Sequence, residues 1–306
     1  MERWEFLRQL AFFSAVAGAG RLMVMPRELW AMAPKDKPQA VLAKVQGTNY
    51  AQITGEAIQA LGGMKKFVNA GETVVVKPNM AWDRTPELAA NAHPAVVRQV
   101  VELCLDAGAK KVKVLDHTCH DARKAYKNSG IQDAVEALKD PRVVVEFVDD
   151  RRFVELNVEG AKALKKWYFY KDILEADRFI NIPIAKNHSE SRLTMSLKNM
   201  MGAIGGWRGR IHVGLHQNIA DMNLILRPDL HILDATRILV KNGPSGGRAE
   251  DVQVKNLVFA GTDPVALDAY GTTLFGLKPG DIGYITKSHE QGRGEMDLNK
   301  IKVLSG

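Results

Sequence analysis

Cysteine is scarce in this sequence. Only Cys104 and Cys119 occur among the 306 residues, and two cysteines exclude both a disulfide framework and a structural metal site made of four cysteines. Cys104 lies in the stretch "AVVRQVVELCLDAG". Because the apolar residues of this stretch recur at helical spacing, we expect Cys104 to be a buried, inert side chain.

Aromatic residues and long runs of basic residues are also scarce. Aromatics make up 7% of the chain, and no Lys/Arg run exceeds two residues although the net charge is +7. The sequence therefore lacks the basic stripe typical of nucleic-acid-binding proteins, and we expect no nucleic-acid partner. A pocket for an anionic ligand accounts equally well for the excess of positive charge. A hydrophobic content of 46% indicates a globular protein with a sizeable core.

The N-terminal segment is expected to serve targeting. It has a charged start, an apolar run over residues 10–19 that is too short to span a bilayer comfortably, and a small-x-small site at Ala31–Ala33. Residues 1–33 are therefore predicted to be an export signal or an amphipathic N-terminal anchor, and residues 34–306 a single α/β domain. We expect a periplasmic or other extracytoplasmic location, with the N-terminal segment as a membrane anchor if it is retained.

The start of this segment is similar to a twin-arginine export signal. The similarity rests on Arg3, Phe6, Leu7 and Arg8, but Trp4 stands where the second arginine of such a signal belongs. We therefore expect export, by a degenerate form of this signal or by another route.

Short apolar segments alternate with helical segments along the rest of the chain. Strands are predicted at residues 41–45, 73–79, 111–116, 143–148, 153–158, 177–186, 230–235 and 256–261. Helices are predicted at residues 53–61, 95–107, 131–138, 193–201 and 263–276. This alternation predicts an α/β fold in three layers, with a largely parallel (mixed) sheet and helices on both faces. Ligands of such folds bind beyond the carboxyl ends of the strands.

Ionisable and polar side chains follow several of these strands at the point where each strand ends. They are Lys77, Asn79, Asp83 and Arg84; Asp116, His117, Cys119 and His120; and Lys186 and His188. We expect the ends of these strands to meet at one edge of the sheet and to form a cationic pocket there for a small anionic ligand.

The cluster "DHTCH" at residues 116–120 offers metal ligands. An Asp, two His and a Cys within five residues suit zinc, nickel, copper or iron. The chain has no C-x-x-C motif to complete a regular structural zinc site. A neutral histidine in this cluster could instead transfer protons, and both interpretations stay open.

The segment "HSESRLTMSLKNMMGAIGGWRGRIH" joins His188 to His212. Lys198 and Asn199 lie where the predicted helix gives way to Gly202, and further glycines follow. Because glycine permits sharp turns and close backbone approach, the chain can fold back and bring both histidines to the lysine. The methionines of the helix are expected to face the core.

Three stretches resemble the DUF362 family: "KPNMAWDRTPELAANAHPAVV", "DRFINIPIAKNHSESRLTMSLKNMMGAIG" and "GTDPVALDAYG". The resemblance extends over roughly residues 41–276 and includes a K-x-H…T-x-x-x-K-N-x-x-G pattern. Many members of that family carry additional ferredoxin-type cysteine motifs. This chain lacks them, so the resemblance does not imply an iron–sulfur cluster in the chain itself.

The order of these residues is also similar, more distantly, to the order of site residues in the nickel-pincer lactate racemase family. That resemblance implies that Arg84 binds a substrate carboxylate and that His117 and His188 exchange protons. It further implies that Lys198 carries a tethered organometallic cofactor and that His212 ligates its nickel.

Two classes of function remain open on the sequence. In the first, the protein is an exported enzyme that acts on a small anionic metabolite with a transition metal (nickel or iron) or a Lys-tethered organometallic cofactor. Its expected catalytic residues are His117, His188 and Lys198, its ligand-binding residues Lys77, Asn79, Asp83, Arg84, Lys186 and Asn199, and its metal ligands His212, Cys119 and His120. In the second, the protein captures an anion or metal in the same pocket without chemistry, or it is a redox accessory protein associated with iron–sulfur proteins. Its expected partner is then a redox protein or a peripheral-membrane partner.

Overall fold

The computed structural model describes residues 39–305. The predicted targeting segment, residues 1–33, lies outside this range. Within the described residues, no helix is both long enough and apolar enough to cross a membrane.

A mixed sheet of ten strands forms the middle of the fold. Eight strands lie in the order β12-β1-β11-β10-β7-β2-β3-β4; β8 also pairs with β10, and β9 pairs with β8. The run from β10 through β7, β2 and β3 to β4 is parallel, whereas β11 is antiparallel to both β10 and β1. The strand bounds are β1 Val41–Gln46, β2 Thr73–Pro78, β3 Lys111–Val114, β4 Val143–Val145, β7 Arg178–Ile182, β8 Ile184–His188, β9 Arg192–Thr194, β10 Leu230–Leu239, β11 Val252–Gly261 and β12 Lys302–Ser305. The predicted α/β class with a largely parallel, mixed sheet is confirmed.

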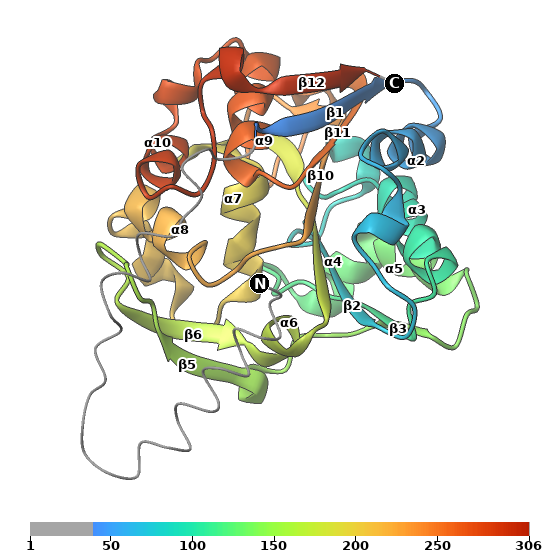
Figure 1. Ribbon diagram of the computed structural model, residues 1–306. Helices are drawn as coiled ribbons and strands as arrows, with labels where there is room; N and C mark the ends of the chain where they lie inside the picture. Colours follow the sequence, from blue (N-terminus) through green and yellow to red (C-terminus); the bar gives the residue numbers. More distant parts are fainter. Residues whose placement is uncertain (1–38, 306) are drawn as a thin grey trace. The chain divides into compact units, whose positions relative to one another are not determined.

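Helices cover both faces of this sheet (Figure 1). On one face α2, α3, α4 and α5 pack against Val74 and Val76, and on the other α8, α9 and α10 belong to the core that contains Val75. This alternation follows from the strand geometry, because successive side chains of a strand point to opposite faces. The helix bounds are α2 Tyr50–Ala60, α3 Pro94–Asp106, α4 Ala122–Asn128, α5 Ile131–Glu136, α6 Lys171–Glu175, α7 Ser196–Asn199, α8 Leu215–Met222, α9 Pro264–Gly271 and α10 Gly283–Glu290.

The segment predicted as one strand over residues 177–186 forms two strands. Strand β7 ends at Ile182, Pro183 interrupts it, and β8 begins at Ile184. Proline has no N–H for the ladder and therefore breaks a central strand. After this break β8 pairs with β9, with Lys186 opposite Thr194.

The helix predicted over residues 193–201 is shorter than expected. Residues Arg192–Thr194 belong to β9, and α7 begins only at Ser196. A 3₁₀ turn over Met200–Ala203 then continues α7. Pairing with β8 therefore takes the first residues of the predicted helix and leaves a single α-helical turn that carries Lys198.

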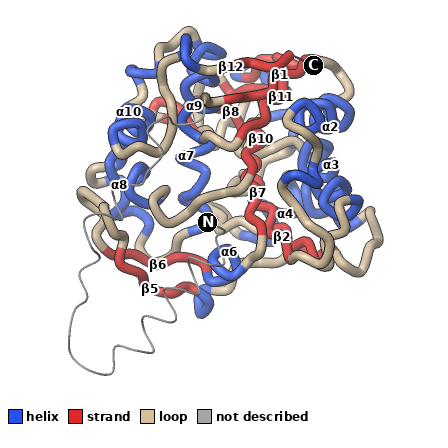
Figure 2. The backbone as a smooth tube through the Cα atoms, in the orientation of Figure 1, coloured by secondary structure: helices blue, strands red, loops and turns tan. Residues whose placement is uncertain are grey.

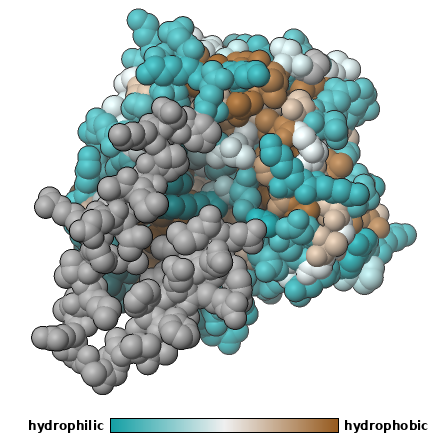
Figure 3. Space-filling view, in the orientation of Figure 1, coloured by the Kyte–Doolittle hydropathy of each residue, from teal (hydrophilic) through white to brown (hydrophobic). Residues whose placement is uncertain are grey.

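The strand predicted over residues 153–158 is real but lies in a second sheet. Strand β5 (Phe153–Asn157) pairs antiparallel with β6 (Lys166–Tyr170), and Figure 2 shows this hairpin apart from the main sheet. Strand β12 at the other end of the chain was not predicted. It adds to β1 as a parallel edge strand, and Figure 3 shows apolar side chains gathered near this edge of the sheet.

Candidate anion-binding site

Three lysines that were predicted to converge are almost completely buried. Lys77 on β2, Lys186 on β8 and Lys198 on α7 are 0%, 1% and 6% exposed. Burial of a lysine is rare because the ammonium group loses its hydration, so each one needs a partner or a function.

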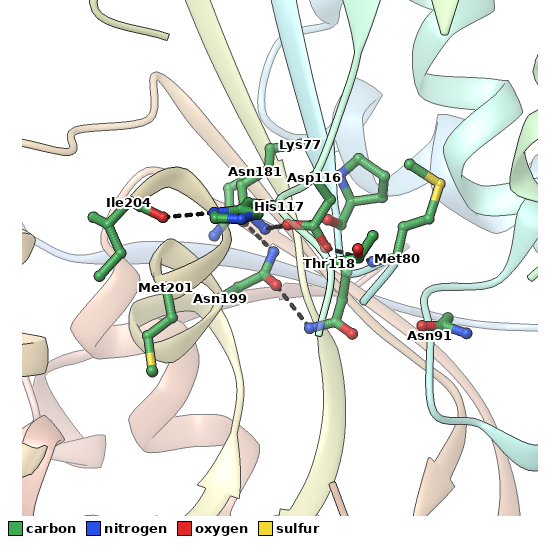
Figure 4. A network of polar contacts seen from close by, with 12 residues as sticks. Lys77, Met80, Asn91, Asp116, His117, Thr118, Asn181, Asn199, Met201 and Ile204 are labelled. Atoms are coloured by element: carbon green, nitrogen blue, oxygen red, sulfur yellow. Dashed lines mark hydrogen bonds and ion pairs between the residues drawn. The ribbon is translucent and has the colours of Figure 1, made fainter. Parts of the chain in front are cut away.

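Lys77 has a partner of opposite charge. Its Nζ lies 2.7 Å from Oδ1 of Asp116, which follows β3, and Figure 4 shows the two side chains together. The second carboxylate oxygen of Asp116 accepts a hydrogen bond from the backbone N–H of Met80 at 2.8 Å. Burial lowers the pKa of Lys77 and the Asp116 carboxylate opposes this shift. Lys77 and Asp116 therefore form a buried ion pair that ties β2 to β3.

Lys186 has only uncharged partners. Its Nζ donates to the carbonyl of Ala90 at 2.5 Å and to Oδ1 of Asn79 at 3.2 Å. No carboxylate within residues 39–305 lies within ion-pair distance of it. Burial, with a contribution from the nearby charge of Lys198 and opposed by negative charge at Cys119, lowers its pKa to about 7. The ammonium of Lys186 therefore lacks a counter-charge.

A chain of buried amides holds the Lys186 side of the site. Asn79 donates to Asn199 at 2.8 Å, and Asn199 donates to Asn181 at 2.7 Å. Asn181 in turn donates to the backbone of Ser196 and to Nδ1 of His231, and Figure 4 shows Asn181 and Asn199 within this network. Each amide uses its NH₂ toward the next acceptor, so the orientation of the Asn79 oxygen toward Lys186 is fixed.

Lys198 also lacks an ion-pair partner in the described part of the chain. Its Nζ contacts the sulfur of Met201 at 3.1 Å, a weak acceptor. Burial lowers the pKa of Lys198 to about 8, opposed by negative charge at Cys119 and Glu190. Its amine therefore stays mostly protonated at pH 7 and loses its proton near pH 8.

His188 is a neutral hydrogen-bond donor in this arrangement. Its Nδ1 accepts from the backbone N–H groups of Glu190 and Ser191 at 3.1 and 3.4 Å. Burial lowers its pKa to about 3, and the charges of Lys198 and Lys186 contribute. In a neutral imidazole whose Nδ1 accepts, the proton resides on Nε2. His188 therefore offers an N–H group beside two unpaired ammonium groups.

His212 and Cys119 lie at the edge of this group. The ring centroids of His212 and His188 are 6.5 Å apart, and His212 Nδ1 is 2.5 Å from Oε2 of Glu190. Cys119 is exposed, and it lies near enough for a thiolate there to raise the pKa of both Lys186 and Lys198. The glycine-containing segment therefore does return His212 to the neighbourhood of His188.

The structure does not bring His117 into the group. Its Nδ1 lies 2.9 Å from the carbonyl oxygen of Ile204, its ring is 5.2 Å from that of Phe153, and its Nε2 is 3.9 Å from Asp150. Figure 4 shows the ring turned toward Ile204. Its described contacts therefore do not pair it with His188 for proton exchange.

Asp83, Arg84 and His120 lie in loops beyond the strand ends and interact locally. Asp83 accepts from Asn128 at 2.6 Å, and its backbone N–H donates to Nδ1 of His120 at 3.2 Å. Arg84 donates to the carbonyl of Asp83 at 2.8 Å, and its buried Nε has no partner in the described chain. None of these contacts places the three residues with Lys186 and Lys198.

Comparison with known proteins identifies the family of this chain. The family model described as "Domain of unknown function (DUF362)" matches residues 74–273. The chain belongs to the DUF362 family. A thylakoid-associated protein of Synechocystis sp. is 30% identical over 233 residues, which cover 74% of this chain and 70% of that relative.

Two solved structures are similar to this DUF362 chain. A protein from Thermotoga maritima shares 11% identity at a TM-score of 0.44, with 81% of this chain and 60% of that chain covered. The lactate racemase apoprotein from Thermoanaerobacterium thermosaccharolyticum shares 13% identity at a TM-score of 0.41, with 76% and 57% covered. This chain thus spans about 60% of the length of these solved proteins.

The side chains of this DUF362 protein do not by themselves form a metal centre within residues 39–305. No group of three or more His, Cys, Asp or Glu side chains is placed to hold a metal ion there. His188 presents a protonated nitrogen, and His212 has one nitrogen engaged with Glu190. A metal held by protein donors alone therefore does not fit the described residues.

Arg208 is a site residue that the sequence analysis missed. It donates to the carbonyl of His117 at 2.7 Å and to that of Thr118, and its charge lowers the pKa of Lys77 and, after burial, that of Lys198. The signal in the sequence was its position in the glycine-containing segment between Lys198 and His212.

Proposed function

We propose that this DUF362 protein binds a small anion, of the carboxylate or a similar oxyanion class, between Lys186, Lys198 and His188. The observation that carries the proposal is the pair of buried ammonium groups without a counter-charge. A bound anion would supply that charge and accept hydrogen bonds from both lysines and from the N–H of His188.

The same geometry supports a catalytic role for Lys198. An amine with a pKa of about 8 is poised to give or take a proton near neutral pH, whereas His188, with a pKa of about 3, is not. In this proposal Lys186 and His188 orient the anion and Lys198 moves the proton. The alternative is a binding protein in which all three groups only hold the ligand.

A Lys198-tethered organometallic cofactor is a second candidate. Lys198 and His212 would hold it, and when bound it would accept hydride from a 2-hydroxy acid. The observation that favours it is the unpaired amine of Lys198. Intact-mass measurement of protein purified from its native host distinguishes the two, because a tether adds mass at Lys198 and anion binding does not.

A panel of anions tests the main proposal. We expect acetate, lactate, malonate or phosphate to raise the melting temperature at pH 6.5 above its value in chloride of equal ionic strength. Equal melting temperatures in all salts would contradict the proposal.

We further propose an extracytoplasmic or membrane-associated location. The name of the Synechocystis relative, a thylakoid-associated protein, and the predicted targeting segment at residues 1–33 support it.

A further inference from the structure

A buried aspartate on α9 lies against the helical turn that carries Lys198. Asp268 is 0% exposed and accepts two consecutive backbone N–H groups at the start of α7. One oxygen accepts from Ser196 at 2.7 Å and the other from Leu197 at 2.9 Å. The first N–H groups of a helix have no partner within the helix. A carboxylate there accepts hydrogen bonds from them and interacts favourably with the helix dipole.

Asp268 has no cationic partner in the described chain. Burial raises its pKa to about 7, and the N–H groups of Leu197 and Ser196 oppose that shift. A buried carboxylate without a cation is costly, so its contact with α7 is its main compensation.

Helix α9 approaches α7 closely on the same side. A Cβ added at Gly271 would lie 2.5 Å from the sulfur of Met195, the residue just before α7. Residues three apart share one face of a helix. Asp268 and Gly271 therefore lie on the same face of α9, and this face packs against the start of α7.

We propose that Asp268 is a positioning residue that fixes α7, and through it the Lys198 amine, next to Lys186 and His188. It acts through the backbone of Ser196 and Leu197 and touches no ligand. Helix α7 is one turn long and has little stability of its own, so its placement depends on such contacts. That this positioning serves anion binding rests on the proposed function. That Asp268 positions Lys198 does not depend on it.

The neighbouring Asp263 provides a matched control. It is also on the "GTDPVALDAYG" stretch, and its carboxylate also accepts two backbone N–H groups, those of Ala266 and Glu295, both at 2.9 Å. Neither group belongs to α7. Asp263→Asn therefore makes the same chemical change at a comparable pair of N–H groups that lie outside the Lys198 turn.

The test is the pH profile of Lys198 acetylation by acetic anhydride in the full chain, measured by mass spectrometry of the peptide that contains Lys198. We expect the midpoint to rise by at least one pH unit in Asp268→Asn, because a loosened α7 lets water reach the amine. Asp263→Asn should lower the melting temperature but leave the midpoint unchanged.

An unchanged midpoint in Asp268→Asn, with a melting temperature lowered as in Asp263→Asn, would overturn the inference. If Asp268→Asn does not fold, the same acetylation profile is measured on Asp268→Ser, which also removes the carboxylate. The acetylation profile requires no bound lactate. A wild-type protein that fails to bind lactate would therefore refute the proposed function, whereas the positioning role would still be decided by the acetylation profile.

Discussion

The three buried lysines differ in what surrounds their charge. Lys77 has a carboxylate at 2.7 Å, whereas Lys186 and Lys198 have only uncharged partners in the described chain. Their lowered pKa values follow from burial without a counter-charge. Clustered groups with such shifts are typical of functional sites rather than of packing.

The pKa values of Lys186 and Lys198 predict how anion binding varies with pH. Both groups must be protonated to attract an anion, and their values of about 7 and about 8 mean that the charge is lost as the pH rises. We expect the affinity for lactate to fall by about tenfold or more between pH 7 and pH 9. Calorimetric titration at constant ionic strength measures this, and an affinity that does not vary over that interval would contradict the assignment.

The ion pair between Lys77 and Asp116 makes a separate prediction about stability. Asp116→Asn leaves a fully buried ammonium without a carboxylate partner, which costs about 3–5 kcal/mol in free energy of unfolding. Urea denaturation near pH 7 measures the loss. Asp140→Asn, which removes the exposed pair with Arg142, is the control and should have little effect. Equal losses in the two variants would show that the buried pair is not important for stability.

Sequence reasoning identified some residues of the candidate site and missed others. Lys186 and His188 were found because they follow an apolar strand, and Lys198 because it precedes a glycine turn. Arg208 and Asp268 were missed because their roles depend on contacts with distant backbone, which spacing along the chain does not reveal. The local interactions of Arg84 and His117 were missed for the same reason.

At the scale of elements, the turn after α7 depends on the absence of a side chain at Gly202. A Cβ there would lie 1.8 Å from Oδ1 of Asp116 and 2.7 Å from Nζ of Lys77. Gly202→Ala should therefore force the ion pair apart and lower the free energy of unfolding by about 3 kcal/mol. Gly55→Ala in α2, whose nearest atom would be 3.9 Å away, is the control and should be neutral or slightly stabilising. A tolerated Gly202→Ala, by urea denaturation, would contradict this account of the turn.

Most elements of the main sheet could be predicted from hydrophobic pattern, and the exceptions have physical reasons. Pro183 divides one predicted strand into β7 and β8. Strand pairing between β8 and β9 overrides the helical propensity of residues 193–194. The sheet to which β5 belongs could not be predicted, because the period of a strand does not specify its partner.

At the scale of the whole molecule, the main prediction concerns the segment outside the described residues. Cleavage at Ala31–Ala33 would give a mature chain beginning near Pro34. N-terminal sequencing of protein from its native compartment tests this, and an intact Met1 in a cytoplasmic fraction would contradict export.

The most direct test of the proposed anion site is a calorimetric titration with lactate at pH 6.5. The wild type should bind, and Lys186→Met and Lys198→Met should each weaken binding by at least tenfold. Lys110→Met, which removes one exposed positive charge elsewhere, should bind as the wild type does. Equal affinities in all four proteins, or no binding by the wild type, would contradict the account.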